Sequence, residues 1–378
     1  MLNKNPWDLT LRQRLGLLKP DTHRVAYFAP KPDSGSFRYR CYNTSQAINS
    51  TMSPVSASFF YRSDLDHLDD LPSLADSLVV FRTPYDTDID RLITDFKRAG
   101  KKVYFDIDDL VFDVQFAPLV TSNLNYKLSG KDIDQWFAFI ANIGACLKLC
   151  DEAITTNSFL AQRIKDFANV PVTVIPNFVN DEQLEISDFL RSDKNFSRSG
   201  NGLALGYFSG SHSHAKDFDV AQTGVLEFLK KSPQSTLTVL GHLELTPALQ
   251  ELGTQVIRKD FVDFLELQRE ISMVDVNLIP LQMSPFTFSK SELKFFEAGF
   301  VETISLATPT PLYGEIIDSG VNGFLSNAAQ WHSKLLEIQF LTIEQRVHVA
   351  QQARTTAESL FSPQAIGDRL ITLFASED

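Results

Sequence analysis

The chain alternates between two patterns of apolar residues. Short apolar runs of strand length are followed by segments in which apolar residues recur every three or four positions, the helical period. Strand–helix alternation of this kind predicts an α/β fold with a parallel sheet covered by helices on both faces. The predicted strands of the first half are residues 24–29, 57–62, 77–82, 101–108, 152–157 and 172–177. The predicted helices are at 37–49, where a loop comes first, 88–100, 132–150 and a segment that ends at Phe167.

The same alternation restarts in the second half of the chain. Residues 193–202 are rich in Gly and Ser, have no apolar period and are predicted to form a solvent-exposed loop. Strands are predicted next at 203–210, 235–241, 255–260, 276–281 and 303–309, and helices at 219–233, 246–253, 264–273 and 288–300. We therefore predict two consecutive doubly wound, Rossmann-like domains, residues 1–185 and 186–360. A C-terminal helix, 361–378, is predicted to return to the first domain.

Two such domains face each other across a cleft, and ligands of open parallel sheets bind at the carboxyl ends of the strands. The turn after the first strand of the second domain contains Ser209, Gly210 and Ser211, and His214 and Lys216 follow it. Backbone N–H groups of such a turn, with a helix N-terminus behind them, can hold a phosphate. The alternative is an ordinary turn with capping serines. The turn lacks the G-x-G-x-x-G pattern of nicotinamide-dinucleotide sites.

A second candidate site is the stretch FSKSELKFFEAGF, residues 288–300. As one helix capped by Ser289, it brings Lys290, Lys294 and Glu297 to within about 60° of one another. The alternative is the solvated face of an ordinary amphipathic helix with weak ion pairs. Because two anion-suited sites follow neighbouring strands of one domain, we favour a bound diphosphate. The Glu297 carboxylate would then accept hydrogen bonds from a ribose diol.

Composition and charge exclude several classes of protein. The net charge of −12 argues against general nucleic-acid binding, which requires a basic surface. Cys41, Cys146 and Cys150 have no further Cys or His at metal-ligand spacing, so we predict buried free thiols and a reducing cytoplasm. No apolar run is long enough to span a bilayer, and we expect no signal peptide.

Residues 6–18 have the pattern of a short amphipathic helix, which Asn5 would cap and Pro6 would begin. Residues 1–24 carry five Lys or Arg against two Asp. We favour packing of the Trp and Leu side chains of this helix against the first domain. The alternative is docking to a partner or a membrane, which would give a weak peripheral membrane contact.

The residues LIPL…SKSELKFFEAG…ATPTPLYGEIIDSGVNGFL resemble the donor-binding signature of glycosyltransferase family four, which has the GT-B fold. The segments LGYFSGSHSHAKDF and YFDIDDLVFD resemble a bacterial polysaccharide-biosynthesis branch of that family. ITTNSFLAQRI and VTVIPNFVN resemble the end of its N-terminal domains. The resemblance extends from about residue 24 to the C-terminus. It implies a retaining transferase that acts on a nucleotide diphosphate sugar without a metal ion.

The resemblance also implies roles for single residues. The family's motif has two Glu separated by seven residues; Glu297 matches the second, which binds the ribose, and Ser289 stands where the first would contact the donor sugar. Lys216 is the match to a basic residue that meets the diphosphate. The residues expected to neutralise the departing diphosphate, a catalytic role, are Lys216, Lys290 and Lys294. The residues expected to bind the donor are Ser209, Gly210, Ser211, His214, Ser289 and Glu297.

Four residues of the first domain are predicted to bind the acceptor. Arg38 and Arg40 follow the first strand and resemble a loop that borders the acceptor in such enzymes; ordinary surface arginines are the alternative. Asp106 and Asp108 end a strand at the cleft, and paired carboxylates of this kind can hold Mg²⁺. Since the resemblance implies no metal, we prefer hydrogen bonding to acceptor hydroxyls, or structural capping, for the two aspartates.

We therefore expect a retaining glycosyltransferase that moves a sugar from a nucleotide diphosphate sugar to a glycan or a lipid-linked oligosaccharide. The implied setting is surface polysaccharide or glycoconjugate biosynthesis, in the cytoplasm or at the cytoplasmic face of the membrane. No cofactor other than the co-substrate is implied. Two alternatives stay open: a nucleotide-sugar epimerase of the same architecture, and a non-catalytic subunit that binds a sugar nucleotide and supports a partner transferase. The missing first Glu of the motif keeps the last alternative open.

Overall fold

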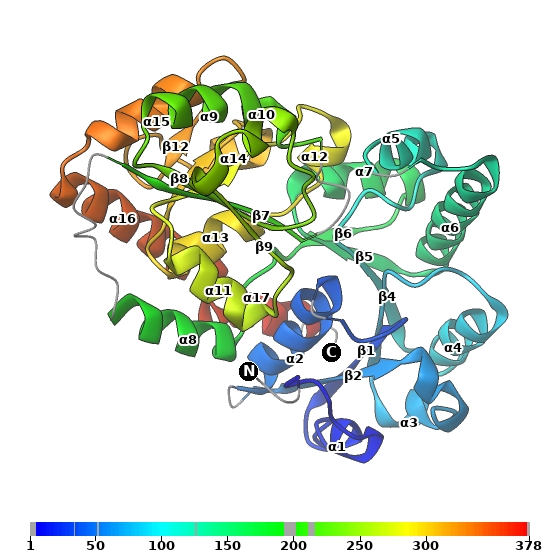
Figure 1. Cartoon of the computed structure of the whole chain (residues 1–378). Helices are drawn as coiled ribbons and strands as arrows, with labels where there is room; N and C mark the ends of the chain where they lie inside the picture. Colours follow the sequence, from blue (N-terminus) through cyan, green and yellow to red (C-terminus); the bar gives the residue numbers. More distant parts are fainter. Residues whose placement is uncertain are drawn as a thin grey trace.

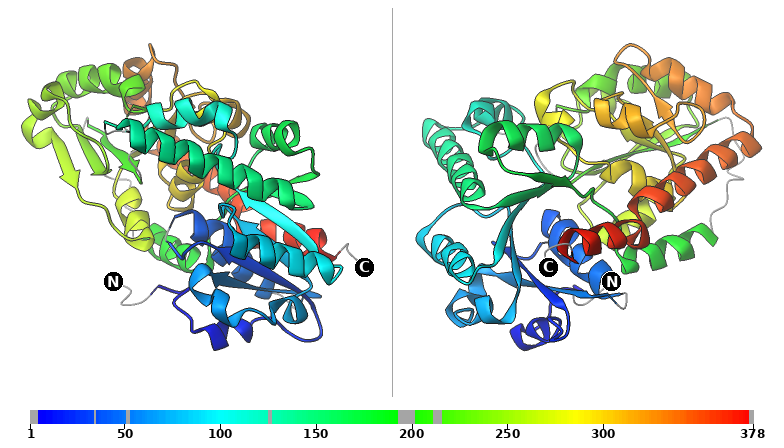
Figure 2. Two further views of the ribbon diagram at one scale, coloured as in Figure 1. Left: turned by 90° about the vertical axis from the view of Figure 1, so that its right-hand side faces the viewer. Right: turned by 180° about the vertical axis from the view of Figure 1, so that it is seen from behind.

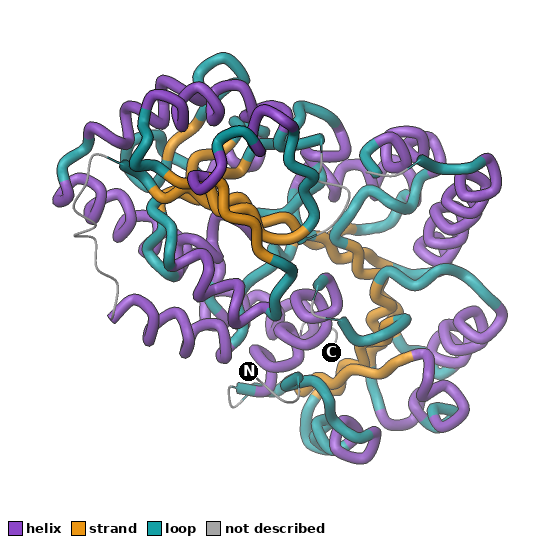
Figure 3. Tube along the Cα trace, viewed as in Figure 1, coloured by secondary structure: helices purple, strands orange, loops and turns teal. Residues whose placement is uncertain are grey.

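The computed structural model describes residues 5–33, 35–50, 53–124, 127–192, 202–210 and 216–375. This part of the chain forms two six-stranded sheets, each surrounded by helices (Figures 1 and 3). Their strand orders are β2-β1-β3-β4-β5-β6 and β12-β11-β10-β7-β8-β9, and the paired strands run parallel. The predicted α/β fold with two Rossmann-like sheets is confirmed.

The bounds of the elements are as follows. The first sheet consists of β1 (His23–Ala29), β2 (Val55–Tyr61), β3 (Ser77–Phe81), β4 (Lys102–Ile107), β5 (Glu152–Thr155) and β6 (Val172–Val174). The second consists of β7 (Ala204–Ser209), β8 (Thr236–Gly241), β9 (Val256–Lys259), β10 (Val276–Ile279), β11 (Ile304–Ala307) and β12 (Phe324–Leu325). The helices before the second sheet are α1 (Leu11–Leu15), η1 (Arg38–Tyr42), α2 (Asn43–Asn49), η2 (Arg62–His67), α3 (Leu71–Leu74), α4 (Thr87–Arg98), η3 (Val114–Phe116), α5 (Ala117–Ser122), α6 (Gly130–Leu149), α7 (Ser158–Ala168) and α8 (Asp181–Ser192). Those that follow are α9 (Asp219–Lys231), α10 (Pro247–Gln250), η5 (Gly253–Gln255), α11 (Phe264–Ser272), α12 (Pro285–Phe288), α13 (Leu293–Phe300), α14 (Pro311–Ile316), α15 (Trp331–Phe340), α16 (Ile343–Phe361) and α17 (Pro363–Ala375).

Both faces of the first sheet are buried, as β1 illustrates. Val25 and Tyr27 belong to one apolar cluster, whereas Ala26 and Phe28 belong to another. Successive side chains of a strand point to opposite faces, so the two clusters lie on either side of the sheet. This double burial explains why the strands appear in the sequence as continuous apolar runs rather than as alternating ones.

Local signals in the sequence determine the bounds of α4. The Asp86 carboxylate accepts hydrogen bonds from the backbone N–H groups of Asp88 and Ile89 at the first turn. Lys97 is in the last turn, where a cation is favourable to the helix dipole. The chain then leaves the helix through Gly100, whose φ of 70° favours glycine. The buried face consists of Ile89, Leu92, Ile93 and Phe96.

The chain crosses between the two halves of the molecule more than once. α8 follows the first sheet but packs against α11, which belongs to the second half. The predicted boundary at residue 185 falls inside α8. The long helix α16 packs against α13, and α17 then packs against α2, which the view from behind shows (Figure 2). Phe374 of α17 contacts the rings of Tyr27 and Tyr104 in the first sheet.

The structure corrects the prediction of one helix over residues 6–18. Only α1 (Leu11–Leu15) is helical, and its N-cap is Thr10, not Asn5. Thr10 and Gln13 form a reciprocal capping box, which satisfies two backbone donors at once and so sets the start of the helix. The backbone N–H of Asn5 instead donates to the Asp8 carboxylate.

The residues around α1 pack on the first domain. Trp7 is buried with the aromatic rings of Phe37 and Tyr42, and Leu18 is buried in the cluster on the other face of the sheet. Arg14 is buried as well, and its guanidinium pairs with the Asp64 carboxylate. Residues around α1 therefore pack on the first domain, as the favoured interpretation predicted.

Two further sequence expectations concern the cysteines and the membrane. Cys41, Cys146 and Cys150 are buried and form no disulfide, which confirms the prediction of buried free thiols. Among the described residues, we find no helix whose length and apolar character would suffice to cross a bilayer.

Candidate active site

A cavity of about 400 Å³ lies between the two domains, at the carboxyl ends of strands from both sheets. The first domain contributes Asp33, Gly35, Ser36, Arg38 and Tyr39. The second domain contributes Phe208, Ser209, Gly210, Leu240, Phe261, Val262, Phe264, Leu267, Ile271, Asn277, Leu293, Lys294 and Glu297. A larger hollow of about 1010 Å³ lies at the amino ends of the first sheet's strands. Because open parallel sheets bind ligands at the carboxyl edge, the first cavity is the candidate site.

Five of the residues predicted from the sequence come together in this cavity: Ser209, Gly210, Lys294, Glu297 and Arg38. Ser209 ends β7 and Gly210 follows it. Lys294 and Glu297 are three residues apart on α13, so both side chains point from one face of that helix. The strand-end rule and the helical period therefore predicted residues that line one cavity in the structure.

Lys294 is a partly buried cation, and no carboxylate of the described residues forms an ion pair with it. Its ammonium donates a hydrogen bond to the carbonyl oxygen of Phe208 and lies 5.2 Å from the centre of the Tyr207 ring. Burial lowers the pKa of Lys294 from 10.5 to about 8, although Asp217 and Glu297 oppose this change. An anion that entered the cavity would stabilise the charged form of this lysine.

Glu297 is bonded to the first domain through a single oxygen atom. The Tyr39 hydroxyl donates to Oε1, the Gln183 amide donates to it at 3.5 Å, and the Arg38 guanidinium lies 3.8 Å from it. Among the described residues, none donates a hydrogen bond to Oε2. Glu297 lines the cavity, and its Oε2 retains a capacity to accept hydrogen bonds that the described residues leave unused.

Arg38, which was predicted to bind the acceptor, lines the same cavity as Lys294 and Glu297. Its guanidinium lies over the rings of Tyr39 and Phe264, at 4.0 and 4.5 Å from their centres. It also donates to the Gln183 side-chain oxygen at 2.5 Å. Arg38 is therefore held at the wall of the cavity, beside Glu297.

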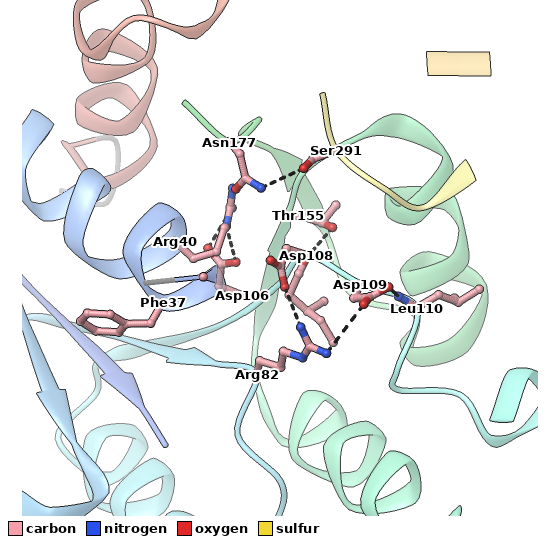
Figure 4. A network of polar contacts seen from close by, with 12 residues as sticks. Phe37, Arg40, Arg82, Asp106, Asp108, Asp109, Leu110, Thr155, Asn177 and Ser291 are labelled. Carbon is pink, nitrogen blue, oxygen red and sulfur yellow. Dashed lines mark hydrogen bonds and ion pairs between the residues drawn. The ribbon is translucent and has the colours of Figure 1, made fainter. Parts of the chain in front are cut away.

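Arg40 and Asp106 pair with each other inside the first domain (Figure 4). Two guanidinium nitrogens donate to the two carboxylate oxygens at 2.8 and 2.9 Å, and a third donates to the Ile175 carbonyl and the Asn177 amide oxygen. Burial raises the pKa of Asp106 to about 6 against the effect of Arg40. Both side chains are sealed from solvent and neither lines the cavity, so their placement does not support acceptor binding.

Asp108 pairs with Arg82 at 3.3 Å, at the end of β4 and outside the cavity (Figure 4). Arg82 also lies 3.7 Å from Asp109, and the Asp109 carboxylate is 3.1 Å from the Lys290 ammonium. Asp108 and Asp109 are thus each close to at least one cation, Arg82 or Lys290. Among the described residues, no group of three or more His, Cys, Asp or Glu is arranged to hold a metal ion.

The structure corrects the prediction of one helix capped by Ser289. Ser284 and Thr287 form a capping box that begins the short helix α12, and Ser289 ends that helix with its hydroxyl bonded to the Phe286 carbonyl. α13 begins only at Leu293. Lys290 therefore precedes α13, does not share the face of Lys294 and Glu297, and does not line the cavity.

The remaining predicted site residues are in the turn after β7. Ser211 and His214 lie outside the described residues. The Lys216 ammonium donates to the backbone oxygen of Ser122 in the first domain, and Lys216 does not line the cavity.

Sequence reasoning missed the apolar wall of the cavity. Leu240 is near the end of β8, and Phe261 follows β9 by two residues. The rings of Phe261 and His242 are stacked, with centres 6.3 Å apart. The strand-end rule that singled out Ser209 would have found these residues, had it been applied to apolar side chains as well as polar ones. Tyr39 was missed because its bond to Glu297 joins positions far apart in the sequence.

Glu292, immediately before α13, is a buried carboxyl group with an unsatisfied oxygen. Oε2 has no hydrogen-bond partner among the described residues, and only 4% of the residue is exposed. Burial raises the pKa of Glu292 from 4.5 to about 8, and the nearby Arg40 opposes this change only in part. The group is therefore protonated at neutral pH in the folded chain.

This leads to a prediction about stability and pH. Below about pH 4.5, Glu292 is protonated in both states; above it, the unfolded chain releases a proton that the folded chain keeps up to about pH 8, so folding stability falls as pH rises. One pKa unit corresponds to about 1.4 kcal/mol, which gives a penalty on the order of 3 kcal/mol at pH 7. Glu292→Gln should raise the free energy of unfolding, increasingly from pH 5.5 to 7.5, in urea titrations. Glu315→Gln, an exposed site on α14, is the control. A gain that does not grow with pH would contradict the prediction.

Several solved structures resemble this chain in fold. HepE of Anabaena, in complex with UDP-glucose, has a TM-score of 0.57 at 14% identity, covering 93% of this chain and 99% of that one. Sucrose-phosphate synthase of Thermosynechococcus elongatus has a TM-score of 0.61 at 12% identity, covering 94% and 98%. WaaG, a glycosyltransferase involved in lipopolysaccharide biosynthesis, has a TM-score of 0.58 at 13% identity, covering 92% and 99%. At these identities the likeness concerns the fold, and this chain has the GT-B fold.

No family model matches the sequence, and no curated protein matches it.

Proposed function

We propose that this protein is a glycosyltransferase that uses a nucleoside diphosphate sugar as donor. The observation that supports this most is the cavity between the two domains, in which the partly buried cation of Lys294 and the carboxylate of Glu297 are one helical turn apart. The diphosphate of such a donor requires a cation, and the ribose diol requires a hydrogen-bond acceptor. HepE, which has the same fold, binds UDP and UDP-glucose in its crystals, so a uridine donor is the first to test.

The chemical task of Lys294 is to stabilise the negative charge that develops on the departing diphosphate. A preorganised cation in a site of low dielectric lowers the barrier to this departure more than the same charge in water would. Arg38, at the same cavity, is a second cation from the opposite domain. Glu297 accepts from the ribose through Oε2 while Oε1 stays bonded to Tyr39.

The proposal includes three finer features that rest on the sequence resemblance. Transfer retains the anomeric configuration, needs no metal ion and delivers the sugar to a glycan or lipid-linked oligosaccharide in the cytoplasm. The leaving diphosphate oxygen takes the proton of the acceptor hydroxyl, so the protein itself need not supply a strong base. The pairing of Asp108 with Arg82 and of Asp109 with Lys290 supports metal independence, because these carboxylates already have cations.

A second candidate function is a non-catalytic subunit that binds a sugar nucleotide. It is favoured by Ser289, which stands in place of a motif carboxylate and whose hydroxyl is bonded to the Phe286 carbonyl inside the protein. The only other carboxyl group close by in the sequence, Glu292, is buried and does not line the cavity.

Release of nucleotide that depends on an acceptor is the test of the proposed function. The protein is incubated in EDTA with UDP-glucose or other nucleotide sugars, with and without a glycan acceptor extract, and free nucleoside diphosphate is measured. We expect release only when donor and acceptor are both present. An altered sugar nucleotide formed without an acceptor would indicate an epimerase. Binding without any turnover would indicate the non-catalytic subunit. Activity that required added Mg²⁺ would contradict metal independence.

Nucleotide binding should depend on the protonation of Lys294. The protonated ammonium binds the diphosphate, so affinity should fall as pH rises through about 8, the pKa that burial imposes on this lysine. A hydrogen bond to a charged group is worth roughly 2 kcal/mol, or about 30-fold in Kd. Lys294→Met should weaken diphosphate binding by about that factor at pH 7 and remove the dependence between pH 7 and 9, as measured by calorimetry. Binding of the unphosphorylated nucleoside is the control and should not change. An unaltered pH profile in the variant would contradict this assignment.

A further inference from the structure

A short segment of the second domain is held by the first domain at three points. The Lys290 ammonium lies 3.1 Å from the Asp109 carboxylate, and the Lys290 carbonyl oxygen accepts a hydrogen bond from the Asn157 side chain at 3.1 Å. The next residue, Ser291, accepts from the Asn177 side chain through its hydroxyl, also at 3.1 Å (Figure 4). We call Asp109, Asn157 and Asn177 the clamp residues.

The clamp residues occupy equivalent places in the first domain. Asp109 follows β4, Asn157 follows β5 and Asn177 follows β6, each by two or three residues, and these strands are neighbours in the sheet. All three side chains therefore come from one edge, the carboxyl edge that faces the second domain. Three polar groups from consecutive strand ends reach two consecutive residues of the other domain, Lys290 and Ser291.

Each clamp residue is itself fixed by a further bond within its own domain. Asp109 accepts from the backbone N–H of Leu110 and lies beside Arg82. Asn157 accepts from the N–H of Leu160, which caps α7. Asn177 accepts from Arg40, whose other nitrogens bind Asp106. Side chains held in this way lose little further conformational freedom when they bind the segment.

The segment leads directly into α13, which carries Lys294 and Glu297. The other half of the cavity, including Arg38 and Tyr39, belongs to the first domain. In the structure the two halves face each other across the cavity, and the clamp contacts join the same two domains. None of the clamp residues, nor Lys290, lines the cavity.

We propose that Asp109, Asn157 and Asn177 are positioning residues that hold the two domains together around the nucleotide site by gripping Lys290 and Ser291. The expected effect on nucleotide binding rests on the proposed function. The contact between the domains does not. The Lys290 cation, expected from the sequence to meet the diphosphate, acts instead on the domain orientation.

Lys290→Met is the variant that tests the clamp with the smallest change to the surrounding packing. It removes the cation but keeps an unbranched apolar side chain over the Phe286 ring, which the Lys290 ammonium now approaches to 4.0 Å from its centre. Asp109 keeps Arg82 as a partner. Lys290→Arg restores the charge and should restore the behaviour of the native chain.

Lys102→Met is the matched control. Lys102 begins β4, pairs with Glu152 at the start of β5 and lies 5.3 Å from the centre of the Tyr104 ring. This variant also removes a lysine that pairs with a carboxylate at one end of a strand of the first sheet, but at the edge of the sheet away from the cavity. Effects common to both variants would come from the loss of an ion pair to the first sheet in general, not from the loss of the clamp.

The first measurement needs no nucleotide. Spin labels on cysteines introduced at Asp69 and Phe340, exposed positions in the first and second domains, report the distance between the domains. The natural cysteines are buried and should not be labelled. We expect a single distance in the native chain and in the Lys102→Met and Lys290→Arg variants, and an additional, longer distance in Lys290→Met. An unchanged distribution in Lys290→Met would overturn the clamp.

The second measurement is nucleoside diphosphate affinity by calorimetry, with UDP as the probe. We expect Lys290→Met to weaken binding about 5- to 10-fold, and Lys102→Met and Lys290→Arg to leave it unchanged. Unchanged affinity in Lys290→Met would overturn the positioning role, even if the domains moved apart. If the native chain bound no nucleotide at all, the proposed function would fail, whereas the distance measurement would still decide whether the clamp exists.

Discussion

Replacing Trp7 by alanine is expected to lower the free energy of unfolding by about 3–5 kcal/mol, the cost of deleting a large buried aromatic side chain. Only 2% of Trp7 is exposed. Its ring contacts Phe37 and Tyr42 of the first domain, and it lies 5.7 Å from the ring of Phe264 in the second. The loss should therefore affect both domains, and urea unfolding followed by circular dichroism would measure it.

Trp136 offers the matched control for this prediction, because it is only partly buried, on α6, where its ring meets that of Phe139. Trp136→Ala should cost clearly less than Trp7→Ala. Equal losses would contradict the assignment of Trp7 to the core.

Deletion of residues 1–19 extends this prediction to the whole N-terminal segment. The deletion removes Trp7 and also Arg14, which leaves the Asp64 carboxylate buried without its partner. The truncated chain should therefore unfold at a lower temperature. Because Trp7 and Leu18 are already buried in the first domain, the full chain should not sediment with anionic vesicles at low salt. Sedimentation would revive the membrane-docking alternative.

Replacing Glu297 by glutamine is expected to weaken nucleotide binding by roughly 30- to 100-fold, or 2–3 kcal/mol. The reason is that a carboxylate oxygen accepts a stronger hydrogen bond from a ribose hydroxyl than an amide does, and the amide nitrogen cannot accept one at all. Glutamine keeps an acceptor for the Tyr39 hydroxyl, so the contact between the domains is retained better than in an alanine variant. Calorimetry with UDP would measure the change.

A ligand without ribose hydroxyls separates this role from a structural one. The native protein should bind the 2′,3′-dideoxynucleotide as weakly as the variant binds UDP, and Glu297→Gln should not weaken binding of the dideoxynucleotide further. Glu302→Gln, two residues beyond the end of α13 and outside the cavity, should bind UDP normally. An equal loss of affinity for both ligands in Glu297→Gln would show that the variant disturbs the cavity rather than the ribose contact.

The period of apolar residues was sufficient to predict the architecture. Runs such as residues 25–29 and 78–81 are apolar at every position because parallel strands are buried on both faces, and the helices between them keep one apolar stripe. α4 illustrates that helix bounds are also local, since Asp86 and Gly100 are within two residues of its ends. The predicted helix starts were wrong where a second capping residue was close by. The helices begin after Thr10 and Ser284, not after Asn5 and Ser289.

Part of the candidate site was likewise within reach of the sequence. Ser209 follows from its place at a strand end, and Lys294 and Glu297 follow from their spacing on a helix. These inferences need only the geometry of single elements and the rule that ligands bind at the carboxyl edge of a parallel sheet. They do not depend on which side chains meet across the cleft.

Only the tertiary structure decided the partners of the other charged residues. Lys290 and Lys294 have the same charge and are four positions apart, but one is neutralised by Asp109 and the other lines the cavity. Arg38 and Arg40 are two positions apart, yet one reaches Glu297 and the other Asp106. These pairs join residues that are distant in the chain. The strength of an ion pair depends on the separation of its charges in space and on their burial, and neither can be deduced from spacing along the sequence.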